Sequence, residues 1–94
     1  MIEKIFGTKT HIKVLLYLHK ISATRNRTTI KELHERLHIS RPSIIKVIND
    51  LKRARIVVVM GTTKARYILI ANTPQRRALW RFINDFEKSF YQLR

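Results

Sequence analysis

The fold of this chain is decided by residues 40–53, SRPSIIKVINDLKR, whose apolar side chains recur at the period of an amphipathic helix. On a helical wheel, Val47, Ile48 and Leu51 lie within about 60° of Ile44. The opposite side carries no large apolar residue and consists of Pro42, Lys46, Asn49 and Arg53. The pattern therefore predicts a helix over 41–53 that buries one face and presents the other to a partner.

A shorter amphipathic helix is predicted just before this one. Thr29 followed by Glu32 has the spacing of a capping box, which starts a helix of about two turns. Its apolar stripe consists of Ile30, Leu33 and Leu37. Residues 38–39 then form a tight turn. Ser40 is the expected N-cap of the following helix, because a serine side chain can accept a hydrogen bond from the free N–H groups at a helix start.

A β-hairpin is predicted after these two helices. The β-branched run 56–59 and the run 67–70 flank residues 61–64, Gly-Thr-Thr-Lys, which would form a polar and cationic tip. Helix, turn, helix and hairpin follow one another in the order of a winged helix-turn-helix, a fold that places its second helix in the major groove of DNA.

Further helices are expected at both ends of the chain. Thr8 can cap the first, which runs to about Ile21. Its apolar stripe at helical spacing consists of Ile12, Leu15, Leu16 and His19. The polar segment 22–28 is predicted to be a loop with one short strand near its end. Thr73 and Pro74 open the last helix as N-cap and first helical residue.

The last helix carries a heptad seam with spacings of four and three residues. The seam could fold back on the winged domain as ordinary core, or it could pair with a second copy of the chain. We favour a homodimer, because this aromatic seam offers more apolar surface than one small domain readily covers. The predicted dimer interface consists of Leu79, Phe82, Ile83, Phe86, Phe90 and Leu93.

Composition indicates a polyanionic partner. The 94 residues include 20 Lys and Arg against 6 Asp and Glu, for a net charge of +14. Most cations therefore lack an acidic partner within the chain, and nucleic acid is the expected ligand rather than an anionic membrane surface. The length suits one domain, with a winged helix-turn-helix at 1–72 and an added helix at 73–94.

Several other classes of protein are not expected. No apolar run approaches the ~18 residues of a membrane span, and the N-terminus lacks the apolar centre of a signal peptide. There are no cysteines, hence no disulfides or thiolate metal sites. The expected location is the cytoplasm, in association with the nucleoid, and no cofactor or metal is expected.

From about Phe6 to Ile70 the chain resembles winged helix-turn-helix transcription regulators of the MarR and ArsR kind, including archaeal ones. Two stretches carry the resemblance: FGTKTHIKVL at 6–15 and ISRPSIIKVINDL at 39–51. The resemblance implies that the N-terminal half of the helix at 41–53 enters the major groove. It implies nothing about the operator or about the direction of regulation.

The chemistry of this helix suits base recognition. Arg41 or Lys46 can pair with guanine, Asn49 with adenine, and Ser43 with a base or a phosphate, while Ile45 could touch a thymine methyl. In the hairpin, contact with phosphates is the safer expectation than insertion into the minor groove, because the loop is short. The complete predicted DNA-binding set is Thr29, Ser40, Arg41, Pro42, Ser43, Ile45, Lys46, Asn49, Arg53, Thr62, Thr63, Lys64 and Arg66.

Residues 34–38, His-Glu-Arg-Leu-His, match the zinc-peptidase pattern H-E-x-x-H. Against a zinc enzyme, His38 falls at the end of a two-turn helix, no obvious third ligand follows, and Leu37 is needed in the core. The pair is better explained as half-exposed surface, and no enzyme is expected.

Three functions remain open. The first is a homodimeric, sequence-specific transcription regulator. The second is an architectural, chromatin-like DNA-binding protein of the same fold, because the positive charge is spread along the whole chain. The third, a protein-interaction module, is disfavoured by the charge of +14.

Overall fold

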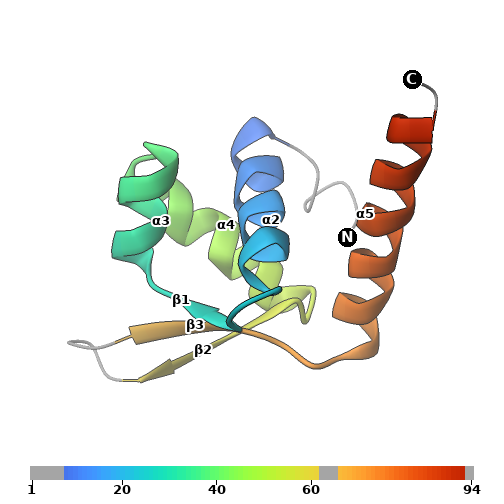
Figure 1. Cartoon of the computed structure of the whole chain (residues 1–94). Coiled ribbons are helices and arrows are strands. Elements are labelled where there is room, and N and C mark those ends of the chain that lie inside the picture. The colour runs from blue at the N-terminus through green and yellow to red at the C-terminus, as the bar shows by residue number, and fades with distance from the viewer. Residues whose placement is uncertain (1–7, 62–65, 93–94) are drawn as a thin grey trace.

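The computed structural model describes residues 8–61 and 66–92, together with their side chains up to residue 88. The described elements are, in order, α2 (Lys9–Ile21), β1 (Arg27–Thr28), α3 (Ile30–Leu37), α4 (Arg41–Arg53), β2 (Val57–Gly61), β3 (Arg66–Ile70) and α5 (Pro74–Gln92) (Figure 1). The predicted order of helices and strands, which makes an α+β fold, is confirmed, including the short strand before α3.

The three strands form an antiparallel sheet in the order β1-β3-β2. Val57 pairs with Ile70 and Val59 with Ile68, and these side chains face inward. In Figure 1 the helices α2, α3 and α4 all lie on one side of this sheet. The sheet therefore has an inner face in the core and an outer face that no described helix covers.

Helix α4 buries the face that its sequence predicts. Its four buried apolar residues are each at most 3% exposed: Ile44, Val47, Ile48 and Leu51. They belong to one core cluster with residues of α2, α3 and the sheet. The polar face of α4 therefore points outward.

The buried face of α2 differs from the prediction. Ile12 and Leu16 are 40% and 47% exposed, and only Leu15 of the predicted stripe is fully in the core. The buried residues are instead His11, Val14, Leu15, Leu18 and Ile21. The prediction was wrong because the helix is apolar over most of its circumference, so its phase is set by where α3 and α4 lie and not by its own pattern.

Helix starts match the predicted caps at three of four positions. The side chains of Thr8, Thr29 and Thr73 each accept a hydrogen bond from a backbone N–H three residues on. Ser40 occupies the N-cap of α4, but its hydroxyl donates to Ser43 Oγ at 2.9 Å and caps no backbone group. The capping box at Thr29 is also incomplete, because the Glu32 side chain bonds elsewhere.

Two helix ends use non-glycine residues in the left-handed region. His38 has φ 56° at the end of α3, where its backbone N–H donates to the His34 carbonyl. Arg55 has φ 64° after α4. The Ile56 N–H donates to the Leu51 carbonyl at 2.9 Å, which completes a Schellman motif. These two turns set the directions in which α4 and β2 leave the preceding helix.

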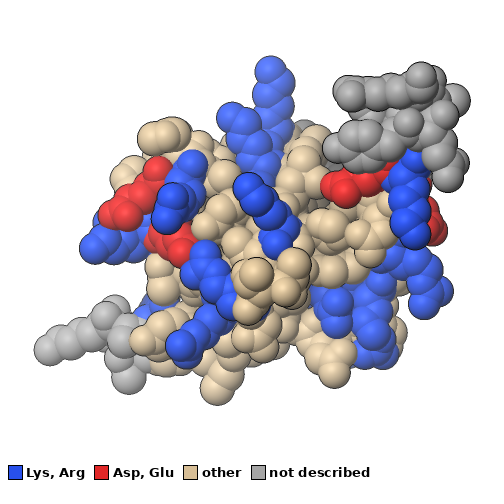
Figure 2. Space-filling view, in the orientation of Figure 1, with Lys and Arg blue, Asp and Glu red and all other residues tan. Residues whose placement is uncertain are grey.

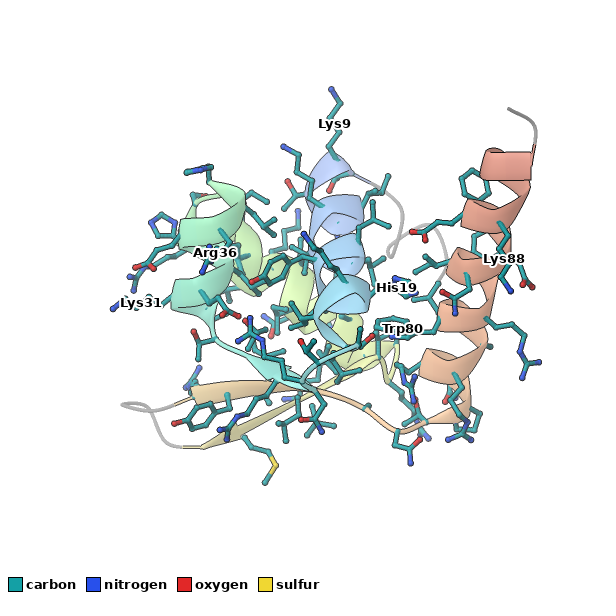
Figure 3. The ribbon with its side chains drawn as sticks, in the orientation of Figure 1. Lys9, His19, Lys31, Arg36, Trp80 and Lys88 are labelled. Atoms are coloured by element: carbon teal, nitrogen blue, oxygen red, sulfur yellow. The ribbon has the colours of Figure 1, made fainter. Side chains whose placement is uncertain are left out.

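The first half of α5 packs against the C-terminal end of α2. Trp80 Nε1 donates to Ser22 Oγ at 3.0 Å, and its ring lies edge-on to His19 with centroids 5.5 Å apart (Figure 3). Asn84 Oδ1 lies 2.9 Å from His19 Nε2. Trp80 and Ile83 belong to the common core. One face of α5 is therefore covered by its own domain.

Candidate nucleic-acid interface

The outward face of α4 presents a row of polar side chains. Arg41, Lys46 and Asn49 are all exposed, and among the described residues none of their side chains has a hydrogen-bond or ion-pair partner. Ile45, at the edge of this face, is 47% exposed. The donors are therefore available to bases, and an apolar contact stands beside them.

The N-terminal turn of α4 adds small groups. Pro42 and Ser43 are exposed, and the Ser43 hydroxyl is shared with Ser40. At the other end, Arg53 Nη1 lies 3.8 Å from Asp50 Oδ1, while its side chain is 68% exposed. An exposed pair at this distance contributes little to stability, so Arg53 can turn to a phosphate at small cost.

A buried polar bridge fixes α4 against α2. His11 is 5% exposed, and its Nε2 lies 2.8 Å from Asp50 Oδ2. Its Nδ1 lies 2.6 Å from Thr8 Oγ1. Asp50 follows directly after Asn49, so the bridge holds the exposed face of α4 in register with the body of the protein. Sequence analysis missed it, because the pattern of α2 does not by itself show that His11 lies on the buried side of the helix.

A second cluster lies at the start of α3. Glu32 Oε1 accepts from Arg25 at 2.7 Å, and its Oε2 accepts from the Thr28 hydroxyl. Burial by itself would raise the pKa of the Glu32 carboxyl, but the hydrogen bonds from Thr28 and Arg25 outweigh it, and the pKa is lowered from its ordinary value. Thr29 caps α3 beside this cluster and is half-buried.

A shallow cavity of about 130 Å³ opens at this cluster. It is lined by Arg25, Arg27, Thr28, Thr29, Glu32 and Tyr67. Thr29 was the one predicted DNA-binding residue outside α4, its N-cap Ser40 and the hairpin, and the structure places it here. Arg25, Arg27 and Tyr67 did not stand out in the sequence, because they come together only when β1 pairs with β3.

The hairpin contributes one described member of the predicted set. Arg66 begins β3 opposite Gly61 and is exposed. Thr62, Thr63 and Lys64 lie outside the described residues. The described hairpin thus presents a guanidinium group at the first residue of β3, next to residues 62–65.

Charge is unevenly distributed over the surface. Figure 2 shows Lys and Arg side chains spread over the visible face, with the acidic side chains gathered in separate places. The described acidic residues other than Asp50 lie on α3 and α5: Glu32, Glu35, Asp85 and Glu87. Asp50 faces His11, so no carboxylate among the described residues lies on the outward side of α4.

The two histidines of the H-E-x-x-H pattern are engaged differently. His34 Nδ1 lies 2.7 Å from the Ile39 carbonyl, while His38 is exposed in the left-handed turn. Within the described residues, no three His, Cys, Asp or Glu side chains are grouped to hold a metal ion. Among those same residues, no helix is long and apolar enough to cross a membrane.

The predicted seam of α5 is divided between two environments. Ile83 is buried in the monomer and Leu79 packs against the core. Phe82 and Phe86 are 57% and 63% exposed, and their rings stack with centroids 6.3 Å apart. The side chains of Phe90 and Leu93 lie outside the described part of the chain.

Helix, turn, helix and antiparallel hairpin, with α2 packed behind them, define the fold as a winged helix-turn-helix. The structure of HlyU from Vibrio cholerae is similar to this one, with a TM-score of 0.68 over 90% of this chain and 85% of that chain, at 14% sequence identity. The likeness confirms the predicted fold class. No family model matches the sequence, and no curated protein does.

Proposed function

We propose that this protein is a DNA-binding transcription regulator that reads base edges with the N-terminal half of α4. The observation that carries the proposal is the outward face of Arg41, Lys46 and Asn49, whose side chains bond to no other described residue. The likeness to HlyU supports the winged helix-turn-helix fold on which the proposal rests. The expected location is the cytoplasm.

In the proposed complex the exposed face of α4 lies in the major groove. Arg41 and Lys46 donate to guanine O6 and N7, and Asn49 pairs with adenine. Ser40, Ser43, Arg53 and Arg66 contact phosphates, which position the helix without reading sequence. The buried bridge between His11 and Asp50 holds this face in one orientation, so little ordering of α4 is required on binding.

Selection of bound sequences from random duplex DNA tests the proposal. We expect a short preferred site, and we expect Lys46→Ala to weaken binding to that site by about 10-fold or more while changing nonspecific binding much less. Lys20→Ala removes an equal charge from the exposed end of α2 and is the matched control. Equal, small losses on all DNA for both variants would contradict base readout.

We propose further that α5 joins two copies of the chain. Phe86 is 63% exposed, and it lies beside the face of α5 that packs into the core through Leu79 and Ile83. Exposed aromatic side chains next to a covered face are a common mark of a protein interface. A two-fold dimer would present two α4 helices to two half-sites about one turn of DNA apart.

Sedimentation of the protein as a function of concentration tests the dimer. Phe86→Glu should shift the mass from dimer to monomer, because a carboxylate is costly to bury in an apolar contact. Val58→Glu, at an apolar position of 45% exposure on the sheet, should leave the dimer intact. If the native protein is still a monomer at the highest protein concentration measured, the dimer proposal is contradicted.

The second candidate is a nonspecific architectural DNA-binding protein. It is favoured by the spread of Lys and Arg over the surface (Figure 2). Binding would then fall with salt at a slope of about −0.9 per phosphate neutralised, equally for every sequence. The selection experiment separates the two candidates, because an architectural protein yields no preferred site.

A further inference from the structure

The outer face of the sheet is apolar, aromatic and cationic at once. Strand pairing places Arg27, Leu69 and Val58 in one row and Tyr67 and Met60 in the next. Val58, Met60 and Tyr67 are 45%, 55% and 43% exposed. No described helix covers this side of the sheet (Figure 1). These five residues, called the outer sheet face below, do not take part in the proposed contact of α4 with duplex DNA.

The charge around this face is positive. The described strands carry Arg27 and Arg66 and no acidic residue. The Arg27 guanidinium lies 5.4 Å from the centre of the Tyr67 ring, within the range of a cation–π contact. The nearest carboxylate of the adjoining cavity, Glu32, is already bonded to Arg25 and Thr28. A partner of this face must therefore combine flat apolar surfaces with negative charge.

We propose that the outer sheet face binds single-stranded nucleic acid, with a base stacked at Tyr67 and the neighbouring phosphate held by Arg27. Single-strand sites in general combine aromatic side chains, on which bases stack, with cations that follow the backbone. The cavity of about 130 Å³ beside Tyr67 adds the Thr29 hydroxyl next to the stacking position.

Duplex DNA does not suit this face. In a duplex the flat faces of the bases are covered by their neighbours in the stack, and only base edges and phosphates remain accessible. The apolar side chains Val58, Met60 and Leu69 would gain nothing from such a partner. In a single strand the bases can be splayed out, so their faces can meet Tyr67. The outer sheet face and α4 thus distinguish two forms of nucleic acid.

The test is fluorescence anisotropy with a labelled 15-residue oligothymidine and, in parallel, a labelled duplex. Salt of about 0.3 M reduces the purely electrostatic part of both affinities. We expect Tyr67→Val to weaken single-strand binding by about 10-fold, the usual effect of losing one stacked base, and to change duplex binding less than about 2-fold. Valine keeps the strand preference of the position, and thermal melting confirms that the variant is folded.

Two further variants complete the experiment. Tyr67→Phe keeps the ring and should retain single-strand affinity. Ile12→Ala removes a comparably exposed apolar side chain from α2 and should have no effect. Equal single-strand affinity for the native protein and Tyr67→Val would overturn the proposal.

The remaining outcomes also decide the matter. Equal losses on single strand and duplex would overturn it, as would dimerisation of the native protein that Tyr67→Val abolishes, since the face would then bind a second copy. If Lys46→Ala loses duplex recognition but retains single-strand binding, the result supports the proposal. It also shows that single-strand binding by the outer sheet face can be tested separately from duplex recognition by α4.

Discussion

Helices α4 and α5 are both amphipathic, but they leave opposite kinds of surface exposed. All four apolar residues of the buried face of α4 are at most 3% exposed, and its outward face is polar and cationic. In α5 the apolar residues are divided, with Ile83 in the core and Phe86 63% exposed. A polar outward face suits a polyanion, whereas an aromatic outward face suits a protein surface. The comparison therefore supports the proposals that α4 contacts nucleic acid and that α5 contacts a second copy of the chain.

The largest expected difference between the two helices is in stability. Leu51→Ala in α4 removes a fully buried side chain and should lower the free energy of unfolding by about 2–5 kcal/mol. Phe86→Ala in α5 should change the stability of the monomer by less than about 0.5 kcal/mol. Urea unfolding at low protein concentration measures both. A large loss for Phe86→Ala in the monomer would show that α5 is part of the core over its whole length.

The buried bridge beneath α4 gives the next effect. Asp50→Ala leaves the Nε2 of buried His11 without its carboxylate and should cost about 1–3 kcal/mol of stability. Asp85→Ala removes an exposed carboxylate from α5 and should stay within about 0.5 kcal/mol of the native protein. Chemical denaturation of the two variants side by side is the measurement. Equal effects would mean that the bridge does not hold α4 in place.

A smaller effect is expected from changing the shape of a cation without its charge. Arg41→Lys in α4 loses the paired donors that match a guanine edge, so binding to the selected site should fall by about 1–2 kcal/mol. The same change at exposed Arg81 of α5 should have no effect on binding. Titration of the selected duplex with each variant measures the difference. If Arg41→Lys binds like the native protein, Arg41 contributes charge and not base recognition.

The junction between the two helices gives the smallest effect, with the opposite sign. Arg55 follows the end of α4 with φ 64°. Its carbonyl oxygen accepts a hydrogen bond of 2.6 Å from the hydroxyl of Thr73, the residue that caps α5. Arg55→Gly removes the cost of the left-handed conformation and should stabilise the protein by about 0.5–1 kcal/mol, as a rise in melting temperature. Destabilisation would indicate that the Arg55 side chain contributes more than its backbone strain costs.

Part of the site was predictable because it depends on local pattern. The bounds of α4, its buried face and its exposed donors follow from a helical period that alternates cleanly between apolar and polar residues. The threonine caps are local as well, since donor and acceptor are three residues apart. The bridge between His11 and Asp50 could not be paired from sequence, because 39 positions separate the two residues.

By itself, then, the sequence determined the order of the elements, the outward polar face of α4 and the positive charge. Tertiary structure decided which side of α2 is buried, because that helix is apolar on most sides and only its neighbours select a face. It also decided that Ile83 belongs to the core while Phe82, one residue before it, stays 57% exposed. Strand pairing gathered Arg27, Tyr67 and Met60 on one surface. Periodicity specifies a helix and its polar side, but burial depends on which other elements pack against it.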